Sequence, residues 1–173
     1  MIARLLSILD NLWYPIRQET AEDTTVCCAK RRRLAMKKSD WLLLAIGEYI
    51  QPIQLQKTLF KFAKESAVPA AESYEFEPYN WGPCSFEIYD DLGSLREQGL
   101  IEAIPSGSGW NIYRLTELGK VKSIEFRKQA SASLVRALDD VRSWVTSRDF
   151  ETLLRDVYKD YPKYATESLF MKS

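Results

Sequence analysis

YEFEPYNWGPCSFEIYDDLGSLREQGLIEAIPSGSGWNIYRLTEL, which spans residues 74–118, is the stretch that decides the fold. At its start, Tyr74, Phe76 and Pro78 are separated by glutamates. This two-residue period is typical of a half-buried strand, and the proline limits that strand to an edge or an end of a sheet. The Asn80–Pro83 segment that follows has the composition of a tight turn.

A helix and a hairpin follow this turn. Ser85 is in position to cap the helix, and Gly99 is in position to close it. The buried stripe of the helix is either Phe86, Tyr89, Leu92 and Leu95 or Ile88, Leu92 and Leu95. Two strand-like runs, 100–104 and 110–115, flank a Pro-Ser-Gly-Ser-Gly tip. Strand, turn, helix and hairpin in this order predict a winged helix, with the hairpin as its wing.

Helical periods flank this stretch on both sides. We expect a helix capped by Ser39 or Asp40 and ended by Pro52, a second that stops before Pro69, a third from Thr116 to about Thr146, and a fourth between Ser147 and Tyr161. The predicted fold is therefore α+β and mostly α. It consists of a winged helix-turn-helix domain at 36–120 and a C-terminal helical extension at 121–173.

Residues 1–35 differ from the rest of the chain. They contain a short apolar start, a polar stretch and the basic run CCAKRRR, after which Met36 looks like a fresh beginning. We interpret residues 1–35 as a poorly ordered N-terminal extension or as the result of an upstream start. The apolar run is too short for a secretory signal, and no window has the roughly 18 apolar residues that a membrane span needs.

The sequence contains no histidine, and its three cysteines match neither a disulfide framework nor a zinc motif. This composition removes histidine bases, histidine-activated nucleophiles and the commonest transition-metal ligand. Adjacent carboxylates such as Asp139 and Asp140 point in different directions on a helix, so they predict a solvated face. We therefore expect no enzyme, no catalytic residue, no metal and no cofactor, and a reducing, cytoplasmic location.

Charge is balanced overall, at 24 basic and 24 acidic residues, but it is unevenly placed. Residues 37–120 carry 8 basic and 12 acidic side chains, a net charge of −4. A negative module opposes the counterion release from which nucleic-acid-binding proteins gain much of their affinity. The charge thus opposes DNA binding, which the predicted fold favours.

The segments that resemble a known family are YEFEPYNWGPCSFEIYDDLGSLREQGLI, YRLTELG and VYKDYPKYATESLF. They are similar to the YwgA-like winged-helix proteins of bacteria and phages and, more distantly, to the SocA-like (Panacea) antitoxin domain. The similarity covers residues 39–170, and Cys84 stands where these families usually have phenylalanine. The resemblance implies a small cytoplasmic regulator, antitoxin or accessory protein without a cofactor, and it names no catalytic residue.

The first functional hypothesis is a DNA-binding transcriptional regulator. The helix that ends at Gly99 would approach the major groove, and the hairpin would contact the backbone or the minor groove. Arg96 is suited to guanine or phosphate, with an ion pair to neighbouring acids as the alternative, and Gln98 is suited to adenine. The predicted DNA-binding residues are Lys57, Lys61, Lys64, Ser94, Arg96, Gln98 and Ser108.

The second hypothesis is a protein-interaction module, such as an antitoxin or an adaptor. Its acidic helix would attract a basic partner such as a toxin. Trp81 and Trp110 would be anchors, with burial in the core as the alternative. The predicted partner-binding residues are Trp81, Glu87, Asp90, Asp91, Glu97 and Trp110.

A homodimer is also predicted, through the helix expected at 121–146. Leu134, Leu138, Val141 and Val145 follow the spacing of a coiled-coil seam. The alternative is that this face packs on the last helix of the same chain.

Overall fold

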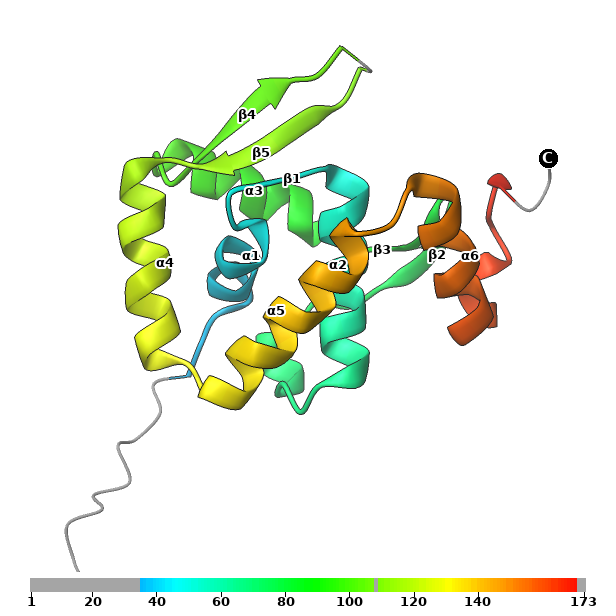
Figure 1. Ribbon diagram of the computed structural model, residues 1–173, viewed down its shortest axis with the longest axis horizontal. Coiled ribbons are helices and arrows are strands. Elements are labelled where there is room, and N and C mark those ends of the chain that lie inside the picture. The colour runs from blue at the N-terminus through cyan, green and yellow to red at the C-terminus, as the bar shows by residue number, and fades with distance from the viewer. Residues whose placement is uncertain (1–34, 108, 171–173) are drawn as a thin grey trace, which may run out of the picture. The chain divides into compact units, whose positions relative to one another are not determined.

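The computed structural model describes residues 35–107 and 109–170, so the extension predicted at 1–35 lies, apart from its last residue, outside the described part. The described chain is α+β and mostly helical, with small antiparallel sheets, as the sequence predicts (Figure 1). Its elements are α1 (Lys38–Ile46), β1 (Tyr49–Ile50), α2 (Pro52–Glu65), η1 (Ala70–Glu72), β2 (Glu77–Tyr79), β3 (Gly82–Cys84), α3 (Glu87–Glu97), β4 (Ile101–Pro105), β5 (Asn111–Leu115), α4 (Glu117–Gln129), α5 (Ala132–Thr146), α6 (Phe150–Asp160) and η2 (Pro162–Ala165).

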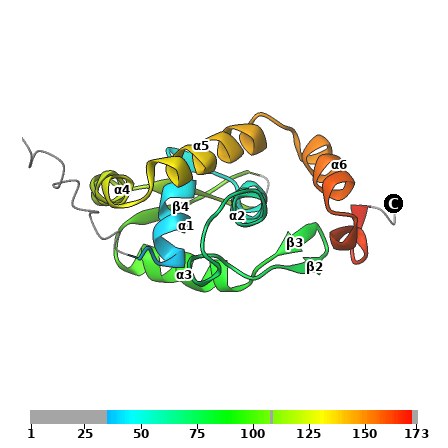
Figure 2. The same cartoon turned by 90° about the horizontal axis from the view of Figure 1, so that it is seen from below.

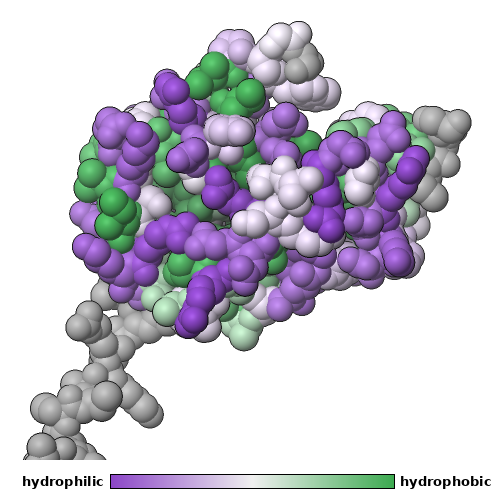
Figure 3. Space-filling model, in the orientation of Figure 1, coloured by the Kyte–Doolittle hydropathy of each residue, from purple (hydrophilic) through white to green (hydrophobic). Residues whose placement is uncertain are grey.

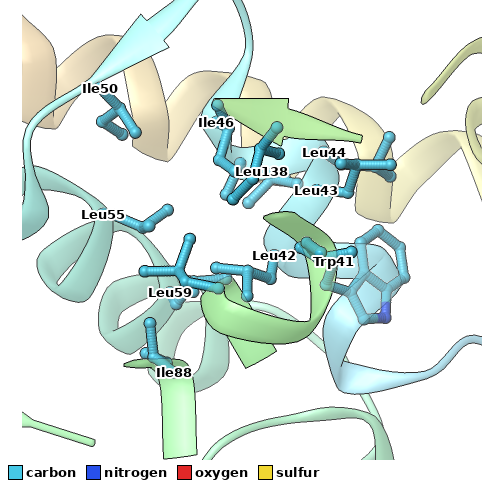
Figure 4. Close-up of a cluster of buried hydrophobic side chains, with 14 of the residues drawn as sticks. Trp41, Leu42, Leu43, Leu44, Ile46, Ile50, Leu55, Leu59, Ile88 and Leu138 are labelled. Carbon is cyan, nitrogen blue, oxygen red and sulfur yellow. The ribbon is translucent and has the colours of Figure 1, made fainter. Parts of the chain in front are cut away.

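Helix α1 lies at the centre of the hydrophobic core. Every residue from Trp41 to Ile46 is buried, as expected of a helix that is enclosed on all sides. Side chains from α2, α3 and α5 surround it, among them Leu55, Leu59, Ile88 and Leu138 (Figure 4). The indole Nε1 of Trp41 donates a hydrogen bond to Glu72 Oε2 at 3.1 Å, so its polar atom is satisfied inside the core.

One antiparallel sheet has the strand order β1-β5-β4. Its β4–β5 hairpin confirms the hairpin expected from the sequence, with Ile101 opposite Leu115. The sequence does not predict β1, because the first helix was expected to reach Pro52. Instead Gly47 adopts a φ of +60° and ends α1, and residues 49–50 then pair with β5. Pro52 is the first residue of α2. A proline is tolerated there because the N–H that it lacks would have no acceptor within the helix.

A second hairpin, β2–β3, replaces the single strand expected at 74–78. Its first strand begins at Glu77, which lies opposite Cys84. Figure 2 shows the hairpin beside α6, which contacts β3. The Gly-Pro-Cys sequence of β3 has weak strand propensity, and this explains why periodicity does not reveal the strand.

Helix α3 buries one of the two predicted stripes. The buried residues are Ile88, Leu92 and Leu95. Phe86 and Tyr89 are exposed, so the other stripe is wrong. The expected cap is also wrong, because Ser85 is buried and its N–H donates to Gln56 Oε1 at 3.0 Å. The helix therefore begins at Glu87.

Two further predicted caps are wrong. The residue before α1 is Lys37, whose N–H donates to the Asp40 carboxylate at 2.8 Å, so neither Ser39 nor Asp40 is the cap itself. Helix α6 is capped by Asp149 rather than Ser147, because the Asp149 carboxylate accepts the N–H of the third helical residue at 2.8 Å. The predicted break at Tyr161 is confirmed.

The single helix predicted from Thr116 to about Thr146 is two helices, α4 and α5. Ala130 and Ser131 separate them with extended backbone, at ψ 160° and 128°. The seam residues Leu134, Leu138 and Val145 are buried, and α5 packs along α2 (Figures 1 and 2). The seam predicted for a homodimer is therefore wrong, since α1, α2 and, at Val145, α6 of the same chain already cover it.

Helices on both sides of residue 120 share one core. Leu134 and Leu138 belong to the cluster around α1, and Val145 and Val157 pack with Phe60 of α2. Across residues 35–107 and 109–170, none of the helices has the length and apolar character needed to cross a bilayer.

Candidate functional site

A pocket of about 570 Å3 opens between the N-terminal end of α2, the β2–β3 hairpin and the first residues of α3 and α6. Much of its lining is aromatic: Tyr79, Trp81, Phe86, Tyr89, Trp110 and Phe150. These side chains come from the β2–β3 hairpin, the start of α3, the β4–β5 loop and the start of α6. We call this cavity the aromatic pocket. Its volume lies within the range of ligand-binding pockets.

The aromatic side chains are partly exposed yet held in place by one another. Trp81 and Phe150 pack edge to face with their ring centroids 5.4 Å apart, and Tyr79 and Phe86 do so at 5.2 Å. Trp110 is 63% exposed and Phe86 is 56% exposed. A contiguous exposed aromatic surface of this kind is typical of an interaction site.

Lys57 is a buried charged residue of the pocket lining, with 2% of its surface exposed. It lies one turn after Ile53 on the same face of α2, and Ile53 also lines the pocket. The Lys57 Nζ donates a hydrogen bond to the Pro83 carbonyl at 2.9 Å. Burial lowers the pKa of Lys57 to about 7, because the desolvated charged form is disfavoured.

The β2–β3 hairpin approaches Lys57 closely at Gly82. This residue adopts a φ of +86°, and a Cβ added there would lie 3.0 Å from the Tyr158 ring and 3.5 Å from the Lys57 Nζ. The link into α3 is fixed by Gln56, whose Nε2 donates to the Ser85 carbonyl at 2.9 Å while its Oε1 accepts the Ser85 N–H. The pocket wall is thus held by hydrogen bonds between the side chains of Lys57 and Gln56 and the backbone of Pro83 and Ser85.

Cys84 also lines the pocket, where phenylalanine was expected from the resemblance. Burial raises the pKa of its thiol, and the nearby Lys57 lowers it by less. The thiol therefore stays protonated at neutral pH, and a protonated thiol is a poor nucleophile. Cys84 acts as a small buried side chain that leaves room in the pocket.

Lys57 and Lys61 were predicted to contact the DNA backbone, and their positions contradict this. Lys61 is 5% exposed, and its Nζ lies 2.5 Å from Glu65, 3.5 Å from Asp160 and 4.2 Å from the centre of the Trp144 ring. Of the three predicted lysines on α2, Lys64 is exposed. Their spacing was taken as a solvated stripe, whereas α5 and α6 cover that side of α2.

The polar residues predicted to read DNA bases lie on α3. Ser94, Arg96 and Gln98 are exposed, close to the C-terminal end of the helix. The Ser94 hydroxyl donates to the Asp90 carbonyl at 3.2 Å. Ser108, predicted in the same group, lies outside the described residues. These residues are separate from the aromatic pocket.

The acidic residues of α3 do not form one free surface. Glu87 is paired with Lys38 at 2.9 Å, and Asp91 accepts a hydrogen bond from the Tyr74 hydroxyl at 2.6 Å. Burial, together with this bond, raises the pKa of Tyr74. Two acids of the predicted partner surface therefore have contacts within the chain, whereas Asp90 and Glu97 are exposed.

Both predicted tryptophan anchors are exposed, and both line the aromatic pocket. Tyr79, Tyr89, Phe86 and Phe150 were not predicted as site residues, and Phe86 and Tyr89 belonged to one of the two buried stripes expected for α3. The sequence did contain a signal for the exposed residues 86 and 89, namely the second possible stripe of α3. If Ile88 faces the core, the side chains at 86 and 89 point in other directions.

A separate apolar surface lies on α4. Its exposed residues are Leu118, Val121 and Ile124. Figure 3 shows green, hydrophobic spheres over that helix. None of the three lines the aromatic pocket.

No protein-family model, no curated protein and no solved structure matches this chain.

Proposed function

We propose that this protein is an interaction module that docks a segment of a partner polypeptide in the aromatic pocket. One observation carries the proposal: Trp81 and Trp110, from separate hairpins, line the same cavity with other exposed aromatic residues. Tryptophan and tyrosine dominate binding energy at protein interfaces, where a few well-packed residues supply most of it. An antitoxin or an adaptor is the class of protein that fits this activity.

We also propose that residues 36–120 form a winged helix. The order α1-β1-α2-α3-β4-β5, with β1 beside β5, supports this proposal, and so does the resemblance to YwgA-like and SocA-like proteins. In this proposal the β4–β5 hairpin is the wing, and it contributes Trp110 to the aromatic pocket.

DNA binding is the second candidate, because Ser94, Arg96 and Gln98 are exposed on the helix that a winged helix usually presents to DNA. The burial of Lys57 and Lys61 weakens this candidate, since it removes two of the expected phosphate contacts. Interaction with a polypeptide is therefore the better supported proposal.

Photo-crosslinking tests the main proposal. Benzoylphenylalanine would replace Phe86, at the pocket, or Leu118, on α4, in the full-length chain within cells. We expect a discrete protein adduct from position 86 and none of the same mass from position 118. The crosslinked protein, once purified, should bind the Trp81→Ala variant at least about tenfold more weakly than the wild type. Equal adducts at both positions would contradict the proposal.

A further inference from the structure

We infer that the aromatic pocket takes the free C-terminal carboxylate of its partner polypeptide, with Lys57 as the cation that binds it and the aromatic walls around the last apolar side chains. This inference rests on the proposed function and adds the chemistry of the docked segment. It follows from the one charged side chain among the described residues of the lining, from the helix end at the mouth of the pocket and from the extent of its aromatic rim.

Lys57 supplies the charge that a carboxylate needs. Among the described residues that line the pocket, Lys57 is the only charged one, and no described carboxylate forms an ion pair with it. Its ammonium has three N–H donors, of which the Pro83 carbonyl accepts one. A buried ammonium without a counter-ion is costly, so a carboxylate from outside would be strongly favoured there.

The N-terminal end of α2 faces the same cavity. Gln51, Pro52 and Ile53 line the pocket at the point where the helix begins. Pro52 has no N–H and the Gln51 side chain accepts the N–H of Gln54, so the positive end of the helix dipole is what this helix start contributes. This second positive feature favours an anion beside Lys57.

The rim indicates a polypeptide rather than a small molecule. Trp110 and Phe86 are more than half exposed although they line the pocket, so aromatic surface continues outside the cavity. A small acid inside the cavity would leave that surface in water, whereas a chain that leaves the pocket would cover it. A C-terminal segment combines such a chain with a carboxylate that enters first.

The pH dependence of binding follows from the groups around Lys57. Burial raises the pKa values of Cys84 from β3 and Tyr158 from α6, and partial desolvation raises that of Tyr89 from α3, so all three groups are neutral near pH 7. Lys57, whose pKa is lowered to about 7, is the one of these four groups that changes charge there. Affinity for a carboxylate should therefore decrease as the pH rises from 6 to about 8.5, by at most tenfold per pH unit.

Fluorescence anisotropy tests the inference with the full-length chain. The probes are a panel of fluorescein-labelled hexapeptides with every pair of apolar residues at the C-terminus, each made as the free acid and as the amide. We expect a subset of the acids to bind and their amides to bind at least about tenfold more weakly. The Lys57→Met variant should abolish this difference, and Lys64→Met, on the exposed end of the same helix, should preserve it.

Acids and amides that bind equally would overturn the inference even if Lys57→Met fails to fold, because this comparison uses the wild type alone. The inference would also be overturned if none of the free-acid peptides binds. It would be overturned as well if the small acid 3-phenylpropionate binds as tightly as the best peptide. Amides that bind the wild type but not Trp81→Ala would refute the carboxylate and leave the docking proposal standing. A partner that crosslinks equally at positions 86 and 118 would instead refute the docking proposal.

Discussion

At the scale of single residues, the difference between the sequence and the structure is greatest at Lys57. Lysines at 57, 61 and 64 share one side of a helix, a pattern that usually indicates a solvated face. The surrounding elements bury the first two and leave the third exposed. Because burial depends on contacts with α5, α6 and the β2–β3 hairpin, no local pattern on α2 could predict it.

The burial of Lys57 should make folding stability depend on pH. Its pKa is lowered from 10.5 to about 7, so above pH 7 the unfolded chain binds a proton that the folded chain has lost. The free energy of unfolding of the wild type should then rise relative to Lys57→Met between pH 7 and 9, by at most about 1.4 kcal/mol per pH unit. Urea unfolding at each pH measures this difference. The Lys64→Met variant should run parallel to the wild type, and parallel behaviour of Lys57→Met would refute the burial of a titrating amine.

At the scale of elements, the sequence predicts those with strong periodicity and punctuation. The helix α2, one of the two stripes expected for α3 and the β4–β5 hairpin are confirmed. It misses β1, which has two residues and depends on pairing with β5, and it misses the break at 130–131, where neither glycine nor proline marks the end of α4. The candidate site is predicted in part: the tryptophans were identified, whereas the cavity depends on the unpredicted β3 strand.

The close approach of α4 to the backbone of Leu100, just before β4, depends on a helical glycine. A Cβ added at Gly119 would lie 1.9 Å from the Leu100 carbonyl oxygen, which belongs to the backbone and cannot move easily. Gly119→Ala should therefore lower the free energy of unfolding by about 2–3 kcal/mol or more, the cost of overpacking. Gly93 in α3 has open space around it, so Gly93→Ala should stabilise by about 0.5–1 kcal/mol. Urea unfolding compares the two variants, and equal effects would contradict this packing.

The position of α5 within the protomer gives another test. Leu138 is 1% exposed, so Leu138→Ala should cost about 2–5 kcal/mol in urea unfolding, whereas Leu118→Ala, at a residue 57% exposed, should cost less than about 0.5 kcal/mol. The cost of Leu138→Ala should not change with protein concentration, because its contacts lie in one chain. If the loss of unfolding free energy in Leu138→Ala varied with protein concentration, the result would support the coiled-coil dimer interface instead.

At the scale of the whole molecule, the described chain after residue 120 is part of the same core as the chain before it. Leu134 and Leu138 cover the cluster around α1, and Val145, Leu153 and Val157 cover Phe60. The aromatic pocket depends on this packing as well, because Phe150 of α6 forms part of its wall. The regions 36–120 and 121–173 are therefore expected to fold as one cooperative unit.

This cooperativity predicts the outcome of truncation. Residues 36–120 expressed alone should lack the near-ultraviolet circular dichroism of packed aromatic side chains, because the faces of α1 and α2 that α5 and α6 cover would be exposed. The full-length chain measured in parallel provides the reference. A cooperative unfolding transition in the fragment would show that 36–120 folds independently.

The central claim is that the aromatic pocket docks a polypeptide, and the most direct test measures two affinities on the same variants. Wild type, Trp110→Ala and Arg96→Ala would be titrated by fluorescence anisotropy with the crosslinked partner and with duplex DNA from upstream of the protein's own gene. We predict that Trp110→Ala weakens partner binding by about thirtyfold, the effect of removing an interface anchor, and that Arg96→Ala leaves it unchanged. Two results together would contradict the claim. One is sequence-dependent DNA binding that Arg96→Ala weakens and Trp110→Ala does not weaken. The other is an unchanged partner affinity in Trp110→Ala.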